Sequence, residues 1–99
     1  MSKPVAHYSA SHRAGDLLFV SGQVGIADGS LVEGVQSQTL QALNNVQAVL
    51  GQSDLTLEHV VKCTVFMTDI DNFAVVNATY AEVFGDHRPS RSAVAVKAL

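Results

Sequence analysis

The stretch Val60–Met67, VVKCTVFM, carries the clearest strand signal in the chain. It is rich in β-branched side chains, which favour extended backbone. Its residues also alternate, with one set facing one way and the other set facing the opposite way: Val61, Cys63, Val65 and Met67 against Lys62, Thr64 and Phe66. The pattern predicts a strand, in which Cys63 packs as a small buried apolar residue.

A helix is predicted on each side of this strand, because apolar residues recur there at helical spacing. The first covers residues 37–50, opens at Ser37 or Gln36, closes at Gly51, and has on its apolar face Leu40, Leu43, Val46 or Gln47, and Leu50. The second covers residues 72–84, follows the N-cap acids Asp69 and Asp71, closes at Gly85, and has on its apolar face Phe73, Val76, Tyr80, and Val83 or Phe84.

Further strands are predicted at both ends of the sequence. Residues 17–20 form a short apolar run that we expect to continue through residues 23–25, with an interruption at Ser21-Gly22. A turn at residues 28–30 leads into a return strand at residues 31–33, which makes a hairpin. A loop at residues 87–91 precedes a last strand at residues 93–99.

The order strand, strand, helix, strand, helix, strand indicates an α+β domain. Each strand–helix–strand unit is expected to be a right-handed crossover. Both helices then lie on one face of a mixed β-sheet, and a chain of 99 residues has nothing left to cover the opposite face. An oligomer in which the open faces meet is the natural solution.

Composition excludes several classes of protein. The net charge is −3 with only 6 Lys and Arg residues, so the basic stripe of an electrostatic nucleic-acid binder is missing, and Arg88 and Arg91 are the only close pair. The single cysteine excludes an internal disulfide. Residues 1–4 lead into no long apolar run and no stretch is long enough to span a membrane, so we expect no signal peptide and a cytoplasmic protein.

Motifs for metals and cofactors are also missing. No two of the histidines, His7, His12, His59 and His87, have the i, i+4 spacing of a helical zinc site, and the one cysteine stands alone. No phosphate-binding loop or serine-nucleophile elbow occurs, and Gly22 with Gly25 is too little for a dinucleotide fingerprint. We expect no metal and no cofactor.

Polar residues remain at the ends of the predicted elements. They include Arg91 before the last strand, Tyr8 near the start, Gly22 in the interruption, and Asn77 within a helix. Arg91 is either a solvated loop residue or a fork for a small carboxylate. Asn77 either caps local backbone groups or serves a site, since a mid-helix Asn is mildly unfavourable.

Four segments are similar to motifs of the RidA (YjgF) family, also called the endoribonuclease L-PSP family. They occur in the family's order along nearly the whole chain: FVSGQ at 19–23, VKCTVF at 61–66 with Asp69, FAVVNATY at 73–80, and RPSRSAV at 88–94. The resemblance implies a chorismate-mutase-like fold and a homotrimer, whose sheets line an inner barrel and whose ligand sites lie between subunits.

The resemblance also implies a function: hydrolysis of reactive enamines and imines such as 2-aminoacrylate to 2-keto acids and ammonia. Arg91 matches the arginine that grips the substrate carboxylate, and Tyr8 matches a catalytic tyrosine. Gly22 and Asn77 match substrate-binding positions, as does Ala93, where the family often has cysteine. No nucleic-acid or membrane partner is implied.

The family's sequences continue through a Pro/Gly turn into one more strand, which carries a glutamate that orients the attacking water. Residues 1–99 contain no counterpart, so we expect a single domain without that strand. Two alternatives to the deaminase stay open. One is a non-catalytic trimer that binds small carboxylates or acts like a chaperone, and the other is a ribonuclease or translation inhibitor, against which the acidic charge argues.

Overall fold

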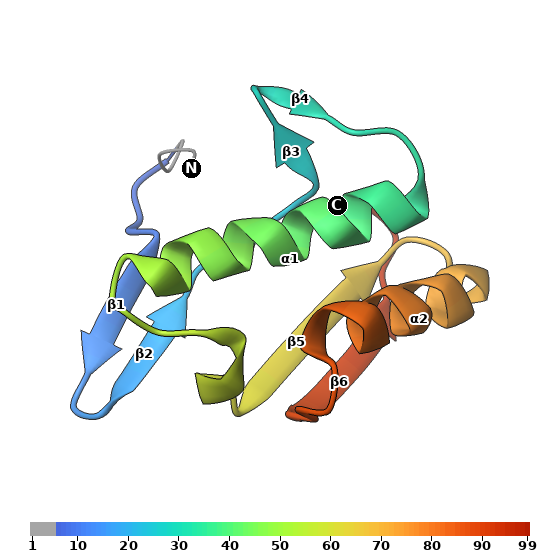
Figure 1. The fold of residues 1–99 in the computed structure, drawn as a ribbon. Coiled ribbons are helices and arrows are strands. Elements are labelled where there is room, and N and C mark those ends of the chain that lie inside the picture. Colours follow the sequence, from blue (N-terminus) through green and yellow to red (C-terminus); the bar gives the residue numbers. More distant parts are fainter. Residues whose placement is uncertain (1–5) are drawn as a thin grey trace.

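The computed structural model describes residues 6–99, so the expectation about residues 1–4 lies outside it. Two long helices pack beside short strands, which makes an α+β domain as predicted (Figure 1). The helices are α1 (Val35–Gly51) and α2 (Phe73–Phe84), and short 3₁₀ turns lie at Leu57–His59 and Ile70–Asn72. The strands are β1 (Ser11–Ala14), β2 (Leu17–Val20), β3 (Ile26–Ala27), β4 (Ser30–Leu31), β5 (Lys62–Met67) and β6 (Ser90–Ala95).

The strands of residues 6–99 form three separate pairs, which corrects the prediction of one continuous mixed sheet. The β1–β2 and β3–β4 pairs are antiparallel, and the β5–β6 pair is parallel. The pairs stay separate because no described strand is hydrogen-bonded to both β2 and β5. Both kinds of pairing are therefore present, but in small sheets.

The β5–α2–β6 unit confirms the predicted crossover between parallel strands, although its handedness stays a prediction. In its register Cys63 lies opposite Arg91, and Val65 lies opposite Ala93. Cys63 and Val65 are partly buried and Met67 is buried, whereas the alternate residues of β5 are exposed. The unit therefore places β6, the strand that carries Arg91, beside α2 (Figure 1).

In the first half of the chain, one strand was not predicted and two elements have wrong boundaries. The prediction missed β1, which pairs with β2 although its own residues are polar. The strand at β2 ends at Val20 and does not continue through residues 23–25. One reason is Gly25, where a Cβ atom would lie 2.6 Å from the Cα of Gln38 on α1, so the chain bends against that helix. The helix itself begins at Val35 rather than Ser37, and it includes Gly51.

The predicted turn at residues 28–30 is confirmed. Asp28 and Gly29 both have positive φ, at 54° and 82°, as a two-residue hairpin turn requires. The return strand β4 is shorter than predicted and ends at Leu31.

The segment after α2 starts its strand earlier than predicted. Gly85 ends the helix with a φ of 63°, as expected. Strand β6 then begins at Ser90 rather than Ala93, because the Ser90 amide already donates to the Val61 carbonyl at 3.1 Å. Arg91 is thus a strand residue and not a loop residue.

The core lies between the helices and the inner faces of the strands. Its buried apolar residues are Leu43, Val49, Leu50, Leu57, Met67 and Val76. Leu43, Leu50 and Val76 were predicted for the apolar faces of the helices, whereas Leu40 is exposed. No helix of residues 6–99 is long and apolar enough to cross a membrane.

The outer faces of β2, β5 and β6 carry apolar side chains that this chain leaves uncovered. Phe19 is 60% exposed and Phe66 is 55% exposed, and Leu17 and Val94 are also exposed. Exposed apolar residues in neighbouring strands are typical of a surface that another subunit covers.

Candidate carboxylate-binding site

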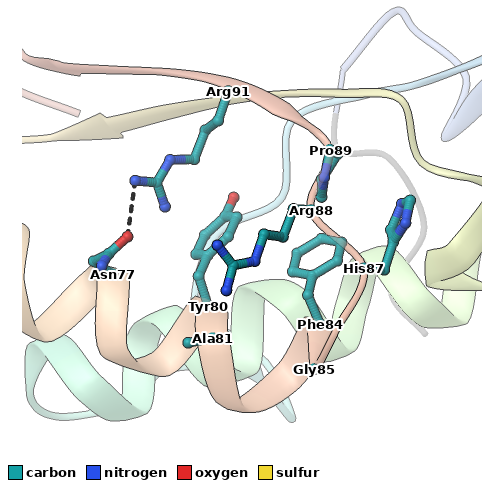
Figure 2. A pocket seen from close by; sticks show the side chains of 9 residues that line it. All are labelled: Asn77, Tyr80, Ala81, Phe84, Gly85, His87, Arg88, Pro89 and Arg91. Carbon is teal, nitrogen blue, oxygen red and sulfur yellow. Dashed lines mark hydrogen bonds between the residues drawn. The ribbon is translucent and has the colours of Figure 1, made fainter.

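Arg91 is held in a fixed orientation against one face of α2. Its Nη2 donates a hydrogen bond of 2.9 Å to the Oδ1 of Asn77 (Figure 2). The guanidinium carbon lies 5.1 Å from the ring centre of Tyr80 and 5.6 Å from that of Phe73, within the range of cation–π attraction. These contacts restrict the guanidinium, and no carboxylate of residues 6–99 forms an ion pair with it.

The helix brings these three partners together by its periodicity. Phe73, Asn77 and Tyr80 are separated by four and then three positions, so they share one face of α2. The mid-helix Asn77, which has a low helical propensity, therefore has a reason to be there. It orients Arg91 through a neutral amide oxygen.

Tyr80 also connects α2 to the strand beneath it. Its hydroxyl interacts with the Cys63 thiol on β5. Burial raises the pKa of the Cys63 thiol, although the Tyr80 hydroxyl and Arg91 partly oppose this. Burial, followed by the proximity of Cys63, raises the pKa of Tyr80 to about 12. Both groups therefore stay protonated at neutral pH, and Cys63 is a packing residue rather than a thiolate nucleophile.

The loop of residues 85–89 forms the other wall of the site. His87 Nε2 lies 2.7 Å from the Val60 carbonyl oxygen, and the His87 ring is tilted against Phe84 at 6.2 Å between ring centres. Ser90 follows the loop and donates to the Val61 carbonyl from both its amide and its hydroxyl, the latter at 2.9 Å. The loop is consequently anchored to the start of β5 by its middle and its end.

A cavity of about 460 Å³ opens between α2 and this loop. Sites for small molecules typically have volumes of about 300–1,000 Å³. Its walls are Asn77, Tyr80, Ala81, Phe84, Gly85, His87, Arg88, Pro89 and Arg91, seen together in Figure 2. They include two arginines and no carboxylate, so the cavity suits an anion.

The predicted site residues are only partly brought together. Arg91 and Asn77 are in direct contact within this chain, although their roles toward a substrate stay predictions. Tyr8, Gly22 and Ala93 are not among the walls of the cavity. Tyr8 is 49% exposed beside β1, and Gly22 has open space where a side chain would be. Their roles stay predictions.

The sequence reasoning missed several residues that line the cavity or contact Arg91. Phe73, Tyr80 and Phe84 were assigned to the apolar face of a helix, and Arg88 to a loop. Asn77 is the signal that could have found them, since an amide between aromatic residues on one helix face is unusual in a core. Within residues 6–99, no group of three or more His, Cys, Asp or Glu side chains is placed to hold a metal ion.

The arrangement can hold a small carboxylate. A guanidinium fork matches the geometry of a carboxylate and can form two parallel hydrogen bonds with it. Arg91 has no carboxylate partner within the described residues that would compete for its free edge.

Comparison with known proteins places the chain in a family. The sequence profile of the family described as endoribonuclease L-PSP matches residues 1–99. A RutC family protein of Pyrococcus horikoshii is 41% identical over 100 residues, which cover 98% of this chain and 79% of that protein. The crystal structure of a putative endoribonuclease from Thermotoga maritima matches with a TM-score of 0.93 and 44% identity, covering 98% of this chain and 79% of that chain.

A third match is the crystal structure of E. coli TdcF with bound serine, with a TM-score of 0.93 and 32% identity over 98% of this chain and 80% of that chain. The chain therefore belongs to the endoribonuclease L-PSP family, the RidA/YjgF family of the sequence analysis. It spans 79% to 80% of the length of these three relatives.

Proposed function

We propose that this protein hydrolyses reactive enamine and imine intermediates of the 2-aminoacrylate type to 2-keto acids and ammonia. The observation that carries the proposal is the uncompensated guanidinium of Arg91, which is oriented by Asn77 and by two aromatic rings at the edge of a cavity. TdcF, whose solved structure holds serine, gives independent support, because serine carries the carboxylate that such a site would bind.

The reaction asks little of the protein. The imine tautomer has an electrophilic carbon that water attacks, the carbon–nitrogen bond then breaks, and ammonia leaves as the keto group forms. Such imines hydrolyse unaided, so only a modest part of the barrier remains to be lowered. Holding the carboxylate in the fork of Arg91 fixes the imine carbon relative to a bound water, which lowers the entropic part of that barrier.

Tyr8, Gly22 and Ala93 are proposed to contact the substrate in the assembled protein. We propose a homotrimer with a chorismate-mutase-like arrangement, in which Tyr8 and Gly22 of one subunit reach the Arg91 site of its neighbour. The exposed apolar faces around Phe19 and Phe66 support this assembly. Burying them would stabilise the trimer by about 25 cal/mol for each Å² of apolar surface removed from water.

The assembly is tested by light scattering, with Phe66→Asp as the perturbing variant. Wild type should have three times the mass of the chain. The variant should have a lower mass, because its trimer would bury an unpaired carboxylate between subunits. A monomeric wild type would refute the trimer.

The proposed location is cytoplasmic, although one relative, mmf1 of Schizosaccharomyces pombe, carries a mitochondrial name.

A second function is favoured by one observation: the cavity wall contains no carboxylate that could act as a general base. Burial raises the pKa of the Tyr80 hydroxyl to about 12, so this group stays protonated at neutral pH. A non-catalytic trimer that binds small carboxylates, or acts like a chaperone, would need only the fork of Arg91.

A coupled assay separates the two functions. A pyridoxal-phosphate-dependent dehydratase generates 2-aminoacrylate from serine, and pyruvate release is followed with and without this protein. Arg91→Ala should abolish the acceleration, whereas Arg13→Ala, which removes the same charge from the exposed strand β1, should leave it unchanged. Acceleration that survives Arg91→Ala refutes the proposed site, and binding of serine without acceleration selects the binding function.

A further inference from the structure

Arg88 is the second cation of the cavity, and the proposed reaction does not use it. Its side chain lies along the α2 side of the cavity, near Tyr80 and Ala81, while Arg91 extends from β6 toward Asn77 (Figure 2). Within residues 6–99, Arg88 has neither a hydrogen bond nor an ion pair. Two guanidinium groups therefore share one cavity without a carboxylate to balance either.

The backbone keeps Arg88 at the cavity. Pro89 follows it directly and restricts the conformation of the preceding residue to extended regions. His87, immediately before it, is held to the Val60 carbonyl at 2.7 Å, and Ser90 is held to the Val61 carbonyl. Arg88 is thus fixed at its backbone and free at its head group, as a residue that closes on a ligand should be.

Two like charges in one cavity favour a ligand with two anionic groups. A monocarboxylate neutralises one guanidinium and leaves the other unpaired, whereas a dicarboxylate can pair with both. Arginine is suited to each role because its planar fork binds carboxylates with defined geometry. The aromatic rings of Tyr80 and Phe84 also line the cavity, and they can pack against the short carbon chain that joins two carboxylates.

We propose that Arg88 determines substrate specificity by binding a second carboxylate, so that the site prefers imines derived from dicarboxylic amino acids. This rests on the proposed function for its chemistry. Water adds to the imine carbon and ammonia leaves, as for 2-aminoacrylate, and the product is a 2-oxo dicarboxylate. Arg91 holds the carboxylate next to the imine carbon, and Arg88 holds the one at the far end.

Calorimetric titration of the products tests the inference without requiring turnover. The probes are 2-oxoglutarate, which has two carboxylates, and 2-oxobutyrate, which has one. We expect wild type to bind 2-oxoglutarate at least about tenfold more tightly, the usual effect of one charge-assisted hydrogen bond. Arg88→Ala and Arg88→Gln should reduce the ratio of the two dissociation constants, 2-oxobutyrate over 2-oxoglutarate, to near one. Arg13→Ala should preserve this ratio.

The outcomes are distinct. A ratio near one in wild type, or a ratio that both Arg88 variants preserve, overturns the inference. A ratio that depends on Arg88 in a protein without deaminase activity refutes the proposed function and leaves the dicarboxylate preference standing. Arg88→Gln keeps most of the side-chain volume, so a folded variant is available even if Arg88→Ala disturbs the loop.

Discussion

Replacing Asn77 by aspartate changes the charge beside Arg91 while keeping nearly the same shape. In wild type a neutral amide oxygen accepts the 2.9 Å hydrogen bond from Arg91. Asn77→Asp converts this contact into an ion pair, which at an exposed site contributes only about 0.2–1 kcal/mol to stability. The fold should therefore be unharmed, but the guanidinium would already have an anionic partner.

The effect on binding follows from distance. A ligand carboxylate in the fork of Arg91 would lie roughly 5 Å from the new carboxylate, where like charges repel by about 3 kcal/mol at an effective dielectric constant near 20. Solvent at this exposed position and ordinary salt reduce the repulsion to about half. Ligand binding should weaken roughly 10- to 30-fold. Asn77→Ala, which removes one hydrogen bond and adds no charge, should cost about 3- to 10-fold.

The assay is the KM for 2-aminoacrylate, or the dissociation constant for a small 2-oxo acid, measured at low and high salt. Asn44→Asp provides the control, because Asn44 is exposed on α1 and the variant has the same net charge. High salt should reduce the difference in ligand affinity between Asn77→Asp and Asn77→Ala, because it screens the repulsion between the carboxylates. Equal binding by these two variants, or a loss in Asn44→Asp as large as in Asn77→Asp, would refute the electrostatic reasoning.

Three more predictions concern the contact between Cys63 and Tyr80 and the bend at Gly25. Tyr80→Phe should raise the pKa of Cys63 further, because it removes the hydroxyl whose interaction with the thiol lowers that pKa. The midpoint of iodoacetamide alkylation against pH should then move upward, and an unchanged or lower midpoint would contradict the contact. The pKa values of Cys63 and Tyr80 are raised in the folded state, so their contribution to stability should be complete at neutral pH and lost as the pH rises toward 12. The Tm should therefore fall in this pH range, and it should fall less in Tyr80→Phe. Equal falls of Tm in wild type and variant would contradict this prediction. Gly25→Ala should destabilise the fold by about 1–3 kcal/mol in urea unfolding, because the new methyl group meets the backbone of α1, whereas Gly22→Ala has open space and should change stability by less than about 0.5 kcal/mol; comparable losses would show that the bend at Gly25 relaxes.

The sequence predicts elements well where pattern and packing agree. Residues 60–67 alternate and are rich in β-branched side chains, and β5 lies there. Strand β1 has no such pattern, because Ser11–Ala14 is polar and depends on its partner β2 for its conformation. A prediction from local pattern cannot see that kind of dependence.

The site shows the same division. Arg91 and Asn77 were found because a polar residue is conspicuous at their positions, and the structure joins them. Tyr80 was assigned to the core because its spacing fits an apolar helix face, and it does lie partly buried. Its second role depends on the register of β5 and β6, which places Cys63 opposite Arg91 and which no single segment encodes.

The anchoring of the loop at His87 and Ser90 has a consequence for how the specificity of this protein can change. Both anchors are hydrogen-bonded to backbone carbonyl groups, those of Val60 and Val61, and any residue at those two positions would supply the same groups. The side chain at position 88 therefore varies independently of the bonds that hold the loop. A lineage, or an engineer, could alter the cavity at this one position while the sheet and the fork of Arg91 remain as they are.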